Sequence, residues 1–105
     1  MSETIKQKIE RARKAFDEIS DYTQEQVDKL IYEAGKIIYK NAAKLAEMAV
    51  NETGLGDVNE KILKNEETGA VFWEYLKDKK SVGIINPEPD EDGLIKVAHP
   101  VGVIA

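Results

Sequence analysis

The chain has 105 residues, 42% of them hydrophobic and 33% charged, which is typical of one small folded domain and excludes a disordered or membrane-embedded segment. Its net charge of -5, with the acidic excess in residues 51–105, argues against nucleic acid as a partner, and no apolar run could span a bilayer. Cysteine is absent and histidine occurs once, so no disulfide, thiolate metal site or cysteine nucleophile is available within these residues. The N-terminus lacks the apolar core of a secretory signal, and a cytoplasmic location is expected.

A first helix is predicted from Ile5 to Ile19, because apolar residues recur at alternating spacings of four and three and so line one helical face. Thr4 and Gln7 fit a capping box at its start. The segment Ser20-Asp21-Tyr22 breaks the pattern and separates this helix from the next.

A second, long helix is predicted to begin at Thr23 and to continue without interruption to "NETGLG", where Gly54 can take the left-handed conformation that closes a helix. Its apolar stripe is wide, so we expect this helix to form the core of the fold. The stripe consists of Val27, Leu30, Ile31, Ala34, Ile37, Ile38, Ala42, Leu45, Met48 and Ala49.

A third helix is predicted to start at Asp57, with Glu60 at the position that completes a capping box. Gly69 weakens its middle, where we expect a kink or a break. The apolar side chains expected to pack are Val58, Ile62, Leu63, Val71, Phe72, Tyr75 and Leu76.

The character of the chain changes after Ser81. The short runs "SVGII" and "LIKVA" favour β-strands, and "NPEPDEDG" between them carries turn residues, so residues 81–99 are predicted to form a hairpin with a long loop. Pro100 separates the terminal run "VGVIA", whose unbroken apolar character predicts a strand covered on both faces. The predicted class is therefore α+β, with three helices in residues 1–80, a hairpin in 81–99 and one strand in 100–105.

The segment "GLGDVNEK" invites a phosphate-binding interpretation, since Gly54 and Gly56 precede a helix. The dinucleotide fingerprint, however, needs a third glycine where Asn59 stands and a strand where a helix is predicted. Asp57 also places a negative charge where an anion would bind. We favour a glycine helix stop followed by an acidic N-cap.

Other candidate groups form no complete catalytic, cofactor-binding or metal-binding set. His99 lies at a strand end without a marked partner, and Trp73 with Tyr75 could form an aromatic recognition pair, although core packing is commoner at this spacing. Glu52 lies at a glycine-closed helix end and is expected to bond nearby backbone amides. Glu66 and Glu67 do not form a carboxylate pair, because adjacent residues point to different faces of a helix. A cation could be attracted by Glu88, Asp90, Glu91 and Asp92, but they lack the pattern of a calcium loop, and a solvated hairpin tip is favoured.

The strings "YTQEQVDKLIYEAG", "ETGLGDVNEKILKN" and "PVGVIA" resemble the N-terminal part of an aldehyde dehydrogenase. The resemblance runs from about Ala12 to Ala105 and is strongest to the CoA-acylating branch, which includes the acetaldehyde dehydrogenases and the bifunctional alcohol–aldehyde dehydrogenases. It implies that residues 100–105 are the first strand of a Rossmann-type cofactor domain and that the hairpin is an arm used in subunit assembly. The chain would then be the N-terminal fragment of a larger enzyme.

The resemblance also implies cofactors and partners. The parent reaction would convert an aldehyde, NAD and CoA into an acyl-CoA and NADH, but the family's catalytic cysteine and its NAD and CoA sites correspond to no residue here. The partner would be the remainder of the dehydrogenase or a second copy, bound through the hairpin and the terminal strand. The first helix, Ile5 to Ile19, could instead address the protein to a bacterial microcompartment, although a packing role is favoured.

Two hypotheses follow from these expectations. In the first, the chain is part of a CoA-acylating aldehyde dehydrogenase and is inactive alone. In the second, it is a stand-alone helical interaction module that binds a dehydrogenase subunit or another protein, since an exposed hairpin edge and an apolar strand suit strand addition.

Overall fold

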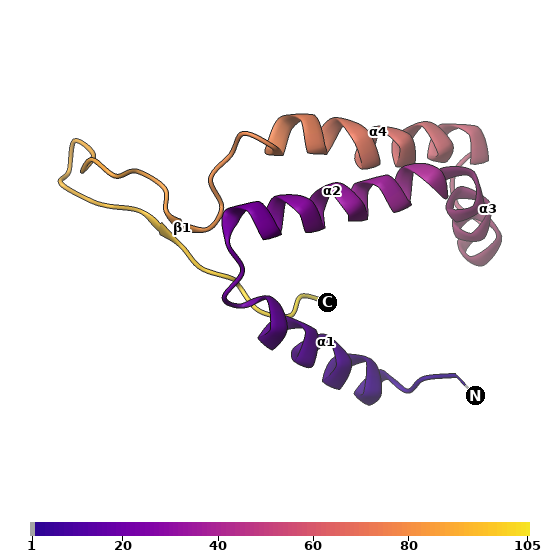
Figure 1. Cartoon of the computed structure of the whole chain (residues 1–105). Helices are drawn as coiled ribbons and strands as arrows, with labels where there is room; N and C mark the ends of the chain where they lie inside the picture. The colour runs from indigo at the N-terminus through magenta and orange to yellow at the C-terminus, as the bar shows by residue number, and fades with distance from the viewer. Residues whose placement is uncertain (1) are drawn as a thin grey trace. The chain divides into compact units, whose positions relative to one another are not determined.

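A computed structural model describes residues 2–105 (Figure 1). It contains four helices and one two-stranded antiparallel sheet, which confirms the α+β class. The elements are α1 (Ile5–Ile19), α2 (Gln24–Lys40), α3 (Ala42–Thr53), α4 (Val58–Leu76), β1 (Gly83–Ile84) and β2 (Val97–Ala98). They form two compact units, one from the residues up to Glu25 together with Lys80–Ala105, the other from Gln26–Lys79. The predicted boundaries after residues 80 and 99 concern domains of a longer enzyme and stay a prediction.

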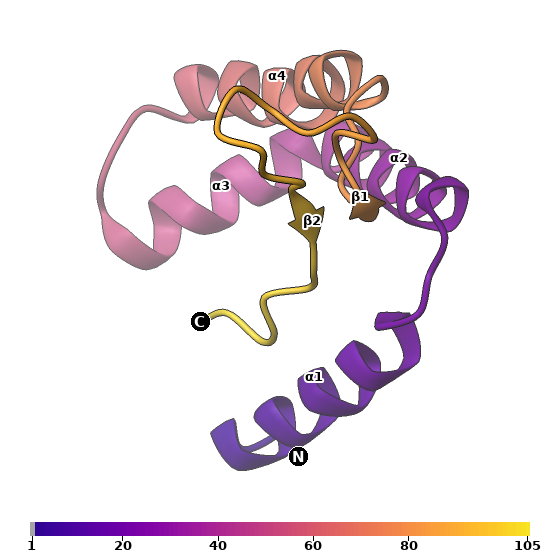
Figure 2. The same cartoon turned by 90° about the vertical axis from the view of Figure 1, so that its left-hand side faces the viewer.

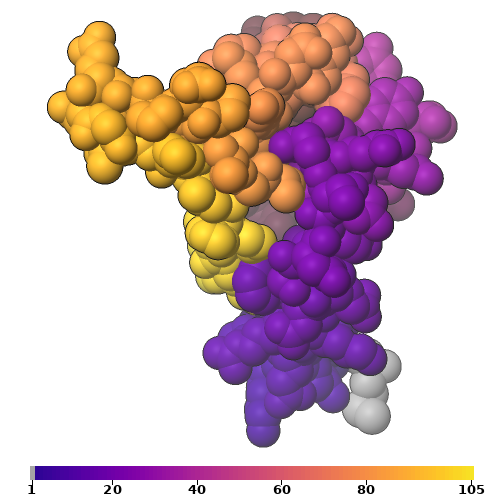
Figure 3. Space-filling model, turned by 60° about the vertical axis from the view of Figure 1, so that its left-hand side comes forward, coloured from indigo at the N-terminus to yellow at the C-terminus, as the bar shows by residue number. Residues whose placement is uncertain are grey.

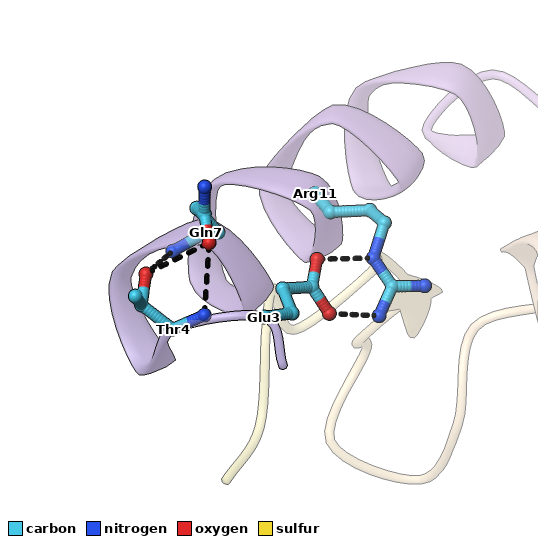
Figure 4. A network of polar contacts seen from close by, with 4 residues as sticks. All are labelled: Glu3, Thr4, Gln7 and Arg11. Carbon is cyan, nitrogen blue, oxygen red and sulfur yellow. Dashed lines mark hydrogen bonds and ion pairs between the residues drawn. The ribbon is translucent and has the colours of Figure 1, made fainter. Parts of the chain in front are cut away.

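The first unit begins with α1, whose start is fixed by local polar contacts (Figure 4). The predicted capping box is confirmed, because the Gln7 backbone N–H donates to Thr4 Oγ1 at 3.2 Å and the Thr4 N–H donates to Gln7 Oε1 at 2.8 Å. Arg11 donates from two nitrogens to the Glu3 carboxylate at 3.0 and 2.8 Å. This bidentate contact raises the pKa of Arg11, first through the hydrogen bond and then through the opposite charge.

The predicted hairpin is confirmed in the same unit. Gly83 pairs with Ala98 and Ile84 with Val97, in antiparallel register. Gln24 anchors its base, since the backbone N–H groups of Ser81 and Val82 donate to Gln24 Oε1 at 2.7 and 3.0 Å. Residues 100–105 form no strand, contrary to the strand expected there. A strand needs a neighbouring strand to bond with, and the only pairing among the described residues, β1 with β2, ends at Ala98. The assignment of residues 100–105 to a cofactor domain stays a prediction.

The second unit shows that the long predicted helix is divided at Asn41. The Asn41 backbone lies at φ -105° and ψ 15°, outside the helical region, and its side-chain amide donates to the Ile37 carbonyl at 2.9 Å. Asparagine competes for backbone groups in this way, which explains the division into α2 and α3. The Asn65 side chain of α4 then donates to the Ala42 carbonyl at 3.0 Å and ties α4 to the start of α3. Figure 2 shows α3 leading through the turn at residues 54–57 into α4.

Helices α2 and α4 run antiparallel and touch through their backbones (Figure 1). A Cβ atom added at Gly35 would lie 2.5 Å from the Gly69 carbonyl oxygen, and one added at Gly69 would lie 2.6 Å from the Gly35 carbonyl oxygen. Both distances are shorter than the contacts that real Cβ atoms make, so α2 and α4 can approach this closely only because both positions are glycine. Helix α4 does not break at Gly69, since it is continuous from Val58 to Leu76, and Gly69 is buried against α2.

The predicted core is largely absent from the described residues. Ala42 and Ala46 are the buried hydrophobic residues there, whereas Ile37 of α2 and Phe72 of α4 are 59% and 57% exposed. A helix buries its apolar face only where another element lies on it. Exposed side chains that were expected to pack also include Leu30, Met48, Leu63, Val71 and Tyr75. Among residues 2–105, no helix is both long and apolar enough to cross a membrane.

Candidate binding groove and the predicted site residues

The turn between α3 and α4 is a helix stop followed by an acidic N-cap, as the sequence predicts. Gly54 has φ 68° and donates its N–H to the Val50 carbonyl at 2.8 Å, and the Glu60 N–H donates to Asp57 Oδ1 at 3.1 Å. A phosphate at this helix start would meet the negative charge of the Asp57 carboxylate, which already accepts the Glu60 N–H. These residues therefore do not fit the phosphates of a nicotinamide dinucleotide.

Glu52 has no part in closing α3. The neighbouring Thr53 makes the local contacts instead: its hydroxyl donates to the Ala49 carbonyl at 2.7 Å and accepts from the Leu55 N–H at 3.1 Å. The expectation that Glu52 bonds these amides is therefore wrong. A threonine hydroxyl, which can donate and accept at once, serves both groups where a carboxylate can only accept.

The hairpin loop uses its polar side chains to hold its own shape. Asp90 Oδ1 accepts from the backbone N–H groups of Asp92 and Leu94 at 3.0 and 2.9 Å. Glu88, Glu91 and Asp92 are exposed. Within residues 2–105, no group of acidic or histidine side chains is arranged to hold a metal ion.

His99 is exposed directly after β2, which agrees with the expected strand-end position. Glu66 is half-buried on α4 and the adjacent Glu67 is exposed, so the two carboxylates do not share an environment. None of these residues is brought against another group with which it could transfer a proton.

Trp73 and Tyr75, for which core packing is the favoured interpretation, have different surroundings, and Tyr75 is not in a core. Trp73 meets Tyr32 of α2, with ring centroids 5.3 Å apart and planes inclined by 66°, an edge-to-face contact. Tyr75 is exposed, and the Lys79 ammonium lies 4.8 Å from the centre of its ring. Trp73 therefore contributes to the surface between two helices rather than to a pair on one.

An open groove of about 460 Å³ lies between α2 and α4, beside the Tyr32–Trp73 contact. It is lined by Tyr32, Lys36, Tyr39 and Lys40 from α2 and by Gly69, Ala70, Trp73 and Glu74 from α4. The sequence analysis did not predict the α2 side of this groove. The spacing of Tyr32, Lys36 and Tyr39, which share one helix face beside the apolar stripe, could have indicated it.

The lining of the groove carries two positive side chains and one negative side chain, and only the negative one, Glu74, has an ion-pair partner among residues 2–105. Glu74 is held by a neighbour on its own helix, since Lys77 Nζ lies 2.6 Å from Glu74 Oε2. That hydrogen bond, with the attraction of the two charges, raises the pKa of Lys77. Lys36 and Lys40 take part in none of the ion pairs found among residues 2–105. The groove thus combines three aromatic rings with two unpaired ammonium groups.

Comparison with known proteins gives consistent matches along the chain. The model of the aldehyde dehydrogenase family matches residues 1–105. The chain is 44% identical over 102 residues to succinate-semialdehyde dehydrogenase (acetylating) of Clostridium kluyveri, a match that covers 97% of this chain and 22% of that protein. It is 45% identical over 103 residues to sulfoacetaldehyde dehydrogenase (acylating) of Bilophila wadsworthia, covering 96% of this chain and 22% of that protein.

A solved structure, the acetylating aldehyde dehydrogenase from Geobacillus thermoglucosidasius, matches with a TM-score of 0.67 and 37% identity. The match covers 80% of this chain and 18% of that one. The chain thus spans about a fifth of the length of these relatives. A match along the whole chain, with these identities and a shared fold, leaves one assignment: the chain belongs to the aldehyde dehydrogenase family.

Proposed function

We propose that this chain supplies the N-terminal helices and hairpin of a CoA-acylating aldehyde dehydrogenase, and that the reaction takes place on residues outside it. The names of the relatives from Clostridium and Bilophila, acetylating and acylating, support the acylating branch. In such an enzyme NAD accepts hydride and CoA accepts the acyl group. The chain has no cysteine to act as the nucleophile, and its one glycine turn before a helix carries Asp57 in place of a phosphate site.

The exposed apolar side chains carry this proposal. The described helices leave Ile37, Phe72 and Leu63 more than half exposed, and two alanines supply the buried hydrophobic residues. Surfaces of this kind mark contacts with other protein. We infer that the remainder of a dehydrogenase, or a second copy, covers them, with the hairpin and residues 100–105 as further contacts, and that the assembled protein is cytoplasmic.

The test is complementation. We expect the purified chain to form no NADH from acetaldehyde, NAD and CoA. Mixed with the Geobacillus enzyme from which the aligned N-terminal segment has been deleted, it should restore NADH formation. The double variant Ile37→Lys/Phe72→Lys should restore much less, because each lysine places a charge where apolar surface must be covered. Lys29→Gln, an exposed change on α2, is the matched control and should restore activity fully.

A stand-alone interaction module is the second candidate, favoured by the two-residue strands of the hairpin, whose edges are open to strand addition. It predicts that the chain binds an intact dehydrogenase subunit in a pull-down experiment and restores nothing to the truncated one. NADH formation by the chain alone, after removal of contaminating enzymes, would refute both candidates.

A further inference from the structure

We propose that the groove between α2 and α4 is a binding site for a small anionic aromatic molecule, a flat ring that carries a carboxylate or a similar negative group. The inference rests on this groove alone and does not depend on the proposed dehydrogenase function. The volume of about 460 Å³ falls in the range of pockets that hold small ligands.

The walls of the groove are suited to a ring. Tyr32 and Trp73 meet edge to face at 5.3 Å and form one side, and Tyr39 lines the same groove seven residues further along α2. Aromatic side chains attract other rings through offset or edge contacts in addition to the apolar area that they bury. Tyrosine and tryptophan also keep a polar atom for an outward hydrogen bond.

Small residues on α4 leave open space in the groove. Gly69 is buried at the crossing with α2, and Ala70 next to it carries one methyl group. The backbone contact between Gly35 and Gly69 fixes how closely the two helices approach. A larger side chain at position 70 would occupy space that is now open in the groove.

The charges select an anion. Lys36 and Lys40 are four residues apart on α2, so their ammonium groups lie on one face and repel each other. The acidic residue at the rim, Glu74, is occupied by Lys77 at 2.6 Å and leaves these two lysines without an ion pair among residues 2–105. A bound carboxylate relieves that repulsion, whereas a cation would increase it.

The test uses the single tryptophan of the chain as a reporter. Trp73 gives one indole N–H resonance in the NMR spectrum, and because Trp73 lines the groove its shift reports binding there. We expect 2-naphthoate to shift the resonance in a saturable way. The neutral analogue 2-naphthamide should bind about fivefold more weakly, as expected for exposed charge pairs.

Two variants separate the contributions of charge and shape. Lys36→Gln/Lys40→Gln should abolish the preference for naphthoate over naphthamide, whereas the control Lys29→Gln/Lys44→Gln, with the same change in net charge outside the groove, should retain it. Ala70→Leu, which keeps a good helix former at an exposed position, should weaken both probes about tenfold by filling the open space in the groove.

Several results would overturn the proposal. These are equal binding of the two probes to the unaltered chain, an equal effect of the two lysine double variants, and no effect of Ala70→Leu. A Trp73 shift that appears on raising the protein concentration without probe, and that the probes do not displace, would show that a second copy fills the groove instead.

Discussion

Two glycines, distant in sequence, set the spacing of the second unit. A Cβ at Gly69 would lie 2.6 Å from the Gly35 carbonyl oxygen and 2.8 Å from the Tyr39 backbone nitrogen. Both neighbours are backbone atoms, which cannot rotate away as a flexible side chain would. The usual gain from replacing a helical glycine by alanine is therefore reversed here.

We expect Gly69→Ala to lower the free energy of unfolding by about 1–3 kcal/mol, because the methyl group forces the two helices apart. Urea denaturation followed by circular dichroism measures this change. Thr68→Ala, at the neighbouring exposed position, should change the stability by less than about 0.5 kcal/mol. A Gly69→Ala variant more stable than the unaltered chain would contradict the close contact.

Gly54 is constrained by its backbone rather than by its neighbours. Its φ is 68°, yet a Cβ added there would have no atom within 4 Å. Gly54→Ala should therefore cost about 1 kcal/mol of unfolding free energy from the left-handed conformation alone. Gly54→Asn should cost less, since asparagine tolerates that conformation, and the two urea midpoints compare them directly. Equal midpoints for both variants would show that the turn rearranges.

Local signals predicted the start and end of several elements. The Thr4–Gln7 box, the Gly54 stop and the Asp57 cap depend on residues within a few positions of each other, so the sequence contains all their determinants. The division at Asn41 was missed because the apolar periodicity continues across it. The meeting of α2 with α4 at the groove was missed for another reason: the Gly35–Gly69 contact joins positions whose proximity no local pattern encodes.

One side-chain hydrogen bond links α4 to the start of α3. Asn65 donates to the Ala42 carbonyl at 3.0 Å from a partly buried position. Asn65→Ala should lower the unfolding free energy by about 1 kcal/mol, the net value of such a hydrogen bond. Asn51→Ala, exposed on α3, is the control and should be neutral or slightly stabilising. If the two variants have equal urea midpoints, the bond contributes nothing.

The hairpin is attached at its base through Gln24. Gln24→Ala removes the acceptor for the Ser81 and Val82 N–H groups, and hydrogen exchange at these two amides should become about tenfold faster. Gln24→Glu keeps the acceptor and should retain most of the protection, while it loses the donor to Ser81 Oγ. Unchanged exchange in Gln24→Ala, measured by NMR, would exclude this anchoring.

At the scale of the whole molecule, apolar surface exceeds what the described units can cover. The sequence predicted which faces of the helices are apolar, but it could not show that most of these faces stay exposed among the described residues. Covering exposed residues such as Ile37 and Phe72 by other protein removes apolar surface from water, which is favourable.

We therefore expect the chain alone to self-associate as its concentration rises. Ile37→Lys/Phe72→Lys should shift the midpoint of association to about tenfold higher concentration, whereas Lys29→Gln should leave it in place. Sedimentation velocity gives the midpoint, and circular dichroism checks that helix content is retained. A chain that stays monomeric throughout the concentration range would contradict the expectation.

The loop of the hairpin carries hydrogen bonds of its own beyond the ladder. The ladder contains two residue pairs, whereas the loop beyond it is bonded internally. The Asn86 side-chain amide donates to the Glu88 and Leu94 carbonyls, each at 3.0 Å, and accepts from the Lys96 N–H at 2.6 Å. Asp90 Oδ1 accepts from the Leu94 N–H and so closes the turn. Figure 3 shows this loop as a compact protrusion. The tip of the arm therefore keeps its shape through bonds of its own, and a partner that reaches it would meet a surface formed in advance.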